Sequence, residues 1–296
     1  MGVIQRQGIK NSIVSYFGVV LGFVSSIYIY PIDLEAKGLM EYFLNIGTLF
    51  LPYAQLGVIA VYNKYFAKLQ STIASFQKWI LKKIIYQFIV FTILFYLLRH
   101  PISDFLLHTG IDVNGSFLKY SFYIPILIFL ILIQTFFLTL CVTNKRTAVA
   151  ELINSTIQKI YFPLIVILNF TLSLEANTFI VLILFYYFIT IPILYIYTKK
   201  LNFFKLSIFN RTASNVGYPV ELKKEIRTYN LFSLLNDISA QLCYKLDTIM
   251  VASFIGFTQT GIYTSMIFMA NVMIIPSGSI MRISNPIVAT HMAENN

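Results

Sequence analysis

Long apolar segments alternate with shorter polar gaps along this chain. We interpret eight of these segments as helices, each close to the roughly 20 residues that cross the hydrocarbon core of a bilayer. The predicted spans are Ile13–Pro31, Leu39–Tyr62, Ile80–Leu98, Tyr120–Val142, Leu152–Leu174, Phe179–Thr198, Tyr229–Phe257 and Ile262–Ile283. None of them shows the two-residue alternation of a membrane strand, and an open sheet would leave backbone groups unpaired in lipid. The pattern therefore predicts an all-α, polytopic membrane protein.

Basic residues gather in every second gap between these segments. Because basic loops of membrane proteins are retained in the cytoplasm, this alternation predicts a multi-pass topology with a cytoplasmic N-terminus. The basic gaps contain Arg6, Lys10, Lys64, Lys68, Lys78, Lys82, Lys83, Lys145, Arg146, Lys199, Lys200, Lys205, Arg211, Lys223, Lys224, Arg227 and Arg282. The opposite gaps contain the acids Asp33, Glu35, Glu41, Asp104, Asp112 and Glu175, beside Lys37, Arg99 and Lys119.

Composition agrees with a membrane location. Hydrophobic residues make up 57% of the chain and charged residues only 11%, whereas a soluble globule usually carries about 25% charged residues. The net charge of +10 lies mostly in short loops beside the predicted spans, where it fits contact with anionic lipid headgroups. We therefore expect anionic lipids, and no nucleic acid, among the partners.

Motifs for catalysis or metal binding do not stand out. Cys141 and Cys243 both lie in apolar segments, too far apart for a metal site or a disulfide framework. The histidines His100, His108 and His291 match no metal-ligand motif, and the longest basic gap contains no Walker-type glycine loop. We expect no enzyme activity, no metal and no cofactor.

Two hairpins of the chain share a pattern. Gly38 opens the second segment and is followed by Pro52, while Gly261 opens the eighth segment and is followed by Pro276 at a similar distance. Both hairpins start on the predicted cytoplasmic side, as in a parallel repeat about an axis along the membrane normal. Because they occupy matching places, Pro52 and Pro276 are candidate hinges. The alternative is that they have no such role, since membrane helices also tolerate proline.

The repeat predicts two units. Residues 1–224 would form a first six-helix bundle that ends in the basic connector Lys199–Thr228. Residues 225–296 would supply the first two helices, the seventh and eighth spans, of a second bundle. Because this second unit stops after two helices, we expect the sequence to be a fragment of a longer protein.

The seventh span carries the densest set of polar residues at lipid depth. A charge at the centre of a bilayer costs about 2.5–3.5 kcal/mol, so such residues face the bundle interior or a water-filled cavity. Helical spacing places Asp237, Gln241, Tyr244 and Thr248 on one stripe. The candidates for a substrate or ion path are Asn236, Asp237, Gln241, Lys245 and Asp247. The alternative is a packing role, with Lys245 paired to Asp237 or to an acid on a helix outside this sequence, and with Asp247 reaching headgroups.

Three stretches of the chain resemble a known family. They are Arg6–Ser12, Gly38–Tyr42, and Asp247–Val251 followed by Gly256 and Gly261–Tyr263. Together they resemble the bacterial polysaccharide (O-antigen) flippases of the multidrug/oligosaccharidyl-lipid/polysaccharide exporter superfamily. Lys245, close to the third stretch, is not a feature that this resemblance requires.

The resemblance implies a carrier of two bundles in the bacterial cytoplasmic membrane. Such a carrier moves undecaprenyl-diphosphate-linked oligosaccharide to the outer leaflet, for lipopolysaccharide O-antigen or another surface polysaccharide. Other membrane proteins of polysaccharide assembly are implied partners. Two alternatives remain open: a cation-coupled drug exporter of the same superfamily, and a membrane polysaccharide polymerase, for which the chain offers no large external loop.

Overall fold

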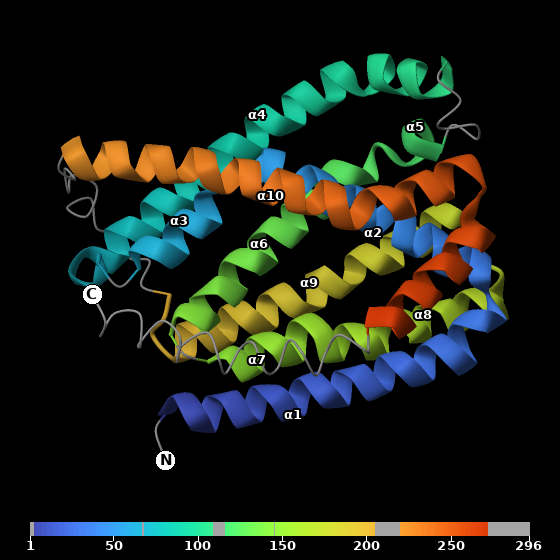
Figure 1. Cartoon of the computed structure of the whole chain (residues 1–296), viewed down its shortest axis with the longest axis horizontal. Coiled ribbons are helices and arrows are strands. Elements are labelled where there is room, and N and C mark those ends of the chain that lie inside the picture. The colour runs from blue at the N-terminus through green and yellow to red at the C-terminus, as the bar shows by residue number, and fades with distance from the viewer. Residues whose placement is uncertain (1–2, 67, 109–115, 145, 205–219, 272–296) are drawn as a thin grey trace, which may run out of the picture.

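The computed structural model describes residues 3–66, 68–108, 116–144, 146–204 and 220–271 (Figure 1). Helices account for nearly all of these residues, and no strand occurs among them. Most of the helices run along the long axis of the molecule, antiparallel to their neighbours in the chain (Figure 1). The predicted all-α class is therefore confirmed.

The helices follow the predicted apolar segments, with longer ends and several breaks. They are α1 (Val3–Val24), α2 (Leu34–Gln55), α3 (Val58–Tyr65), α4 (Ile73–His108), α5 (Ser116–Tyr120), α6 (Tyr123–Thr143), α7 (Thr147–Glu151), α8 (Gln158–Leu172), α9 (Ala176–Lys200) and α10 (Val220–Phe254). Residues 257–271 form a further helix. π-Helical turns at Ser25–Ile29 and Leu152–Ile157 and 3-10 turns at Tyr30–Ile32 and Gln70–Thr72 lie between them.

Four of the described helical segments are long and apolar enough to cross a membrane, and the bent pair α2 and α3 counts as a fifth if it is one span. The four are Ile13–Ile32, Gln70–Asp104, Tyr123–Thr143 and Ala176–Lys200. α8 is apolar but shorter, and α10 does not qualify because polar side chains interrupt its apolar surface. Several membrane-spanning helices are thus supported, while the arrangement in two bundles stays a prediction.

Local sequence explains how the first hairpin turns. The Ser25 hydroxyl donates to the carbonyl of Leu21 at 2.8 Å, where α1 passes into its π-helical turn, and Pro31 follows in the 3-10 turn. Asp33 then caps α2, because its side chain accepts a hydrogen bond from the backbone N–H of Ala36 at 2.9 Å. The turn between α1 and α2 is therefore fixed by side-chain to backbone hydrogen bonds at both of its ends.

The second span is broken near the predicted kink. Leu56 and Gly57 both adopt left-handed backbone conformations, with φ of 44° and 73°, and α2 and α3 meet at 66°. Pro52 lies one turn earlier, inside α2, where its carbonyl accepts the closing hydrogen bond from Leu56 N. The bend is a structural fact, whereas a hinge motion about Pro52 stays a prediction. Pro276 lies outside the described residues.

The bundle has two ends of different chemistry. We call the end with Lys64, Lys199 and Lys224 the basic end, and the end with Asp33 and the Gly256 turn the hairpin end. α2 and α6 lie in the middle of the bundle, and α10 lies across α2, which is its most extensive contact. α10 already begins at Val220, so the boundary predicted at residue 224 lies inside this helix.

Candidate functional site

The two predicted hairpins contact each other in the same way from both sides at the hairpin end. A methyl group added to Gly38 of α2 would collide with the backbone carbonyl of Phe257, and one added to Gly261 would collide with the carbonyl of Leu34. Leu34 and Phe257 each lie one helical turn before the glycine of their own helix. Such a reciprocal contact is what a two-fold relation between equivalent segments produces.

A buried ion pair lies on α2 beside this glycine contact. Lys37 is only 5% exposed, pairs with the carboxylate of Glu41 one turn along the helix, and lies 4.3 Å from the centre of the Tyr30 ring. Asn45, one turn further, donates from its side-chain amide to the Glu41 carbonyl at 2.7 Å and to the carboxylate at 3.4 Å. These side chains form a polar stripe on an otherwise apolar helix.

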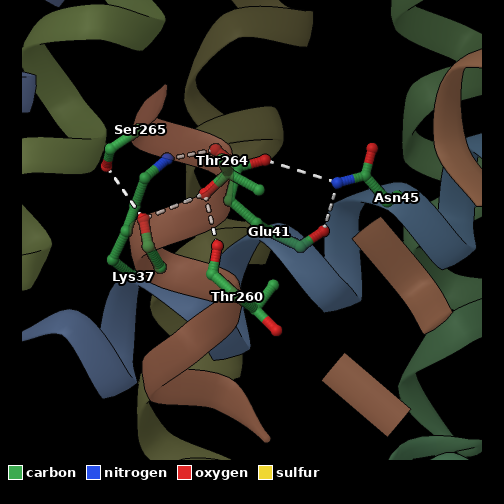
Figure 2. Close-up of polar contacts among 7 residues, drawn as sticks. Lys37, Glu41, Asn45, Thr260, Thr264 and Ser265 are labelled. Atoms are coloured by element: carbon green, nitrogen blue, oxygen red, sulfur yellow. Dashed lines mark hydrogen bonds and ion pairs between the residues drawn. The ribbon is translucent and has the colours of Figure 1, made fainter. Parts of the chain in front are cut away.

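Hydroxyl groups of the helix at 257–271 face this stripe (Figure 2). Thr260, Thr264 and Ser265 are all buried. Their hydroxyls donate to carbonyls of their own helix, at 2.8 Å to Gly256, 2.9 Å to Thr260 and 2.8 Å to Gly261, respectively. We call the surface between the stripe of Lys37, Glu41 and Asn45 and these hydroxyls the polar seam.

The polar seam is satisfied within each helix. Lys37 and Asn45 donate to Glu41 of the same helix, and the three hydroxyls donate to their own backbone. Among the described residues, no hydrogen bond joins the two sides of the seam. Separating the helices there would therefore expose polar groups to water without breaking a hydrogen bond between them, which lowers the cost of opening.

The predicted path residues of α10 are divided between two contacts. Asp237 is half-buried and accepts a hydrogen bond from Gln55 Nε2 at 3.3 Å, so it faces α2. Asp247 is exposed, and one carboxylate oxygen lies 3.5 Å from the Tyr263 hydroxyl on the helix at 257–271. The structure therefore connects α10 to both helices of the seam.

The other three candidate path residues, Gln241, Asn236 and Lys245, differ in how far they are buried. Gln241 is half-buried, and its side-chain oxygen is buried without a partner among the described residues, as at the edge of a polar path. Asn236 is exposed, and Lys245 is half-buried. Within the described residues Lys245 forms no ion pair with Asp237, which instead accepts a hydrogen bond from Gln55.

The predicted stripe on α10 is covered unevenly. Thr248 is buried, in agreement with it, but Tyr244 is 80% exposed. An apolar hollow of about 500 Å³ lies between α2, α4 and α10 at this level. Its lining includes Leu49, Tyr53, Tyr86, Val90, Leu94 and Leu242. α10 contributes Leu242 to this hollow, on a different side of the helix from Tyr244.

Sequence reasoning missed Lys37 and Glu41 as members of a site. It assigned both to a polar gap, whereas the structure places Lys37 among the least exposed residues of α2. The available signal was the spacing: Lys37, Glu41 and Asn45 recur every four residues, which puts them on one helical face.

Comparison with protein-family models, with curated proteins and with solved structures finds no match to this chain.

Proposed function

We propose that this chain belongs to a membrane transporter that flips undecaprenyl-diphosphate-linked oligosaccharide across the bacterial cytoplasmic membrane by alternating access. The product would serve the biosynthesis of a surface polysaccharide. The observation that carries the proposal is the reciprocal contact of Gly38 and Gly261, next to a polar seam with no hydrogen bond across it in the described residues. The activity is transport, without a chemical step.

A carrier needs a contact that closes one side of the membrane and can open again. The two glycines allow the backbones of α2 and the helix at 257–271 to approach closely, as small residues do between membrane helices. The polar seam beside them is stable in both states. When the helices are in contact, hydrogen bonds within each helix satisfy its polar groups, and when water enters, Lys37 and Glu41 are hydrated. An apolar contact of the same area would lose its stabilisation whenever water entered.

A lipid-linked sugar requires both a polar and an apolar route. Asp237, Gln241 and the polar seam offer hydrogen-bonding groups to a sugar or diphosphate along α10 and α2. The hollow between α2, α4 and α10 has an apolar lining that suits a prenyl chain. The two features follow each other along α2, since Asn45 of the seam and Leu49 of the hollow are one helical turn apart.

A second candidate function is a cation-coupled drug exporter. The buried pair of Lys37 and Glu41 favours it, because a carboxylate that can leave its lysine is suited to exchange with a proton or metal cation. In this case the polar seam would carry the coupling ion rather than face the sugar.

Reconstitution of the full-length protein in proteoliposomes separates the two functions. A lipid-linked oligosaccharide with a fluorescent sugar, loaded in one leaflet, should become accessible to an impermeant quencher faster than in protein-free vesicles. Gly261→Val should remove most of this gain, because its side chain would collide with Leu34. Ethidium transport in place of lipid movement would support the exporter, and movement of every phospholipid at the same rate would contradict both.

A further inference from the structure

A hollow of about 520 Å³ lies at the basic end, away from the polar seam, between α3 and the first turns of α10. Its lining residues are Lys64, Lys224, Glu225, Thr228, Tyr229 and Phe232. Lys64 comes from α3 and the others come from α10, so the hollow bridges the two predicted units of the chain. A ligand bound there would contact both units at once.

The charges of the hollow favour an anion. Two lysines and one glutamate line it, and the glutamate is already shared, since Glu225 Oε2 lies 3.9 Å from Lys68 Nζ. The Lys64 ammonium lies 4.0 Å from the centre of the Tyr229 ring, which holds the cation at the wall of the hollow. Lys64 and Lys224 therefore face the same space, where an anion between them would relieve their repulsion.

The hollow also lies where α10 changes from polar to apolar exposed residues, as a helix does at the level of lipid headgroups. The residues that follow it on α10 are large, apolar and exposed, with Leu231 57%, Phe232 65% and Leu235 54% exposed. Such side chains require hydrocarbon around them, whereas Lys224 and Thr228 one or two turns earlier require water or headgroups. Phe232 itself lines the hollow, so an anion bound there would carry its apolar part along α10.

We propose that this hollow binds the phosphate of an anionic membrane lipid between Lys64 and Lys224. The Thr228 hydroxyl is placed to donate a further hydrogen bond to the phosphate, and Phe232 contacts the start of an acyl chain. The bound lipid fastens α3 to α10 and so stabilises the basic end. This lipid is a structural partner and not the transported substrate, so the proposal does not depend on the proposed function.

Lipid titration of the full-length protein tests the proposal by native mass spectrometry. Phosphatidylglycerol should bind as a discrete adduct, and Lys64→Ala with Lys224→Ala should weaken that binding roughly tenfold or more. The control removes the same charge elsewhere at the basic end, in Lys82→Ala with Lys200→Ala, where both lysines are exposed and outside the hollow. The control pair should change the affinity by less than about threefold.

A second pair of variants guards against misfolding. Lys64→Arg with Lys224→Arg keeps both charges, and it should retain phosphatidylglycerol binding. Equal losses in the alanine pair and its control would mean that only surface charge matters, and would overturn the proposal. It would also be overturned if phosphatidylcholine bound as tightly, because the site would then not select an anionic headgroup. Displacement of the lipid by millimolar inorganic phosphate would show that the hollow recognises free phosphate and not a lipid, and would overturn the proposal too.

Discussion

Gln55 of α2 donates a hydrogen bond to the carboxylate of Asp237 on α10, over 3.3 Å. The contact lies at the last residue of α2, directly before the left-handed pair Leu56 and Gly57 where the span bends by 66°. It therefore ties the first helix of the predicted second unit to the point at which the first unit is broken. A movement of α10 would therefore displace the residues of this bend, and a change of the bend would displace α10.

The first prediction concerns this hydrogen bond. Gln55→Ala should lower the free energy of unfolding in mild detergent by about 1–2 kcal/mol, because a half-buried carboxylate loses a donor. An equilibrium unfolding titration measures the change. Ser239→Ala is the control, since Ser239 is exposed on the same helix, donates to the Leu235 carbonyl of its own helix, and should change stability by less than about 0.5 kcal/mol. Equal effects of the two variants would show that the contact with Asp237 contributes nothing.

The second prediction concerns the reciprocal glycine contact. Gly38→Ala and Gly261→Ala should destabilise the protein by similar amounts, of roughly 2 kcal/mol or more, because each methyl group meets a backbone carbonyl that cannot rotate away. The double variant should cost less than the sum, since both changes separate the same pair of helices. Thermal unfolding in detergent, followed by loss of compact monomer, gives the comparison.

Gly47→Ala serves as the control for this series. Its methyl group would meet the end of the Leu127 side chain, which can change rotamer, so the cost should be clearly smaller than at Gly38. If Gly38 and Gly261 differ widely in cost, the two contacts are not equivalent, and the predicted repeat loses its structural support.

The hydrophobic pattern predicted the helices well, because a chain segment that crosses a bilayer has few conformations other than a helix open to it. Each predicted span is helical over most of its described length, since backbone groups in lipid must be satisfied within a helix, with short breaks at residues 56–57, 121–122, 173–174 and 255–256. The breaks were harder to place. Pro52 indicated a kink, but α2 continues past it and ends at Gln55, because the left-handed pair Leu56 and Gly57 and not the proline changes direction.

The candidate site could be predicted only in part, for two physical reasons. A lysine near the start of a membrane helix looks the same in sequence whether it reaches headgroups or, like Lys37, is buried against a facing helix. A stripe drawn on one helix also cannot show which part of it another helix covers: Thr248 is buried, Asp237 is half-buried and Tyr244 is exposed. Both failures concern contacts between segments far apart in the chain.

The third prediction concerns the buried ion pair. Glu41→Gln alone should lower the free energy of unfolding by about 3–5 kcal/mol, because it leaves the buried Lys37 ammonium unpaired. Lys37→Met alone should cost less, because the Glu41 carboxylate is partly exposed and still accepts from Asn45. The double variant should recover most of this loss. Equilibrium unfolding of the four proteins forms a double-mutant cycle. Additive losses, with no recovery, would mean that the two groups are hydrated and do not depend on each other.

The fourth prediction concerns orientation in the membrane and uses single cysteines. The background removes the native thiols by Cys141→Ala and Cys243→Ser, of which the first is buried and the second exposed. Lys200→Cys lies at the basic end and Glu175→Cys at the opposite end, and both positions are exposed. Because basic loops stay in the cytoplasm, an impermeant maleimide should label Glu175→Cys in intact cells and Lys200→Cys only after permeabilisation.

The two cysteines control for each other, because α9 separates them by its full length. Labelling of Lys200→Cys alone in intact cells would show that the topology is the inverse of the predicted one. The hairpin end with its polar seam would then face the cytoplasm. An inverted chain would also place the Lys64 and Lys224 hollow in the outer leaflet. Labelling of both cysteines in intact cells would show that α9 does not cross the membrane, which would remove the basis of a carrier altogether.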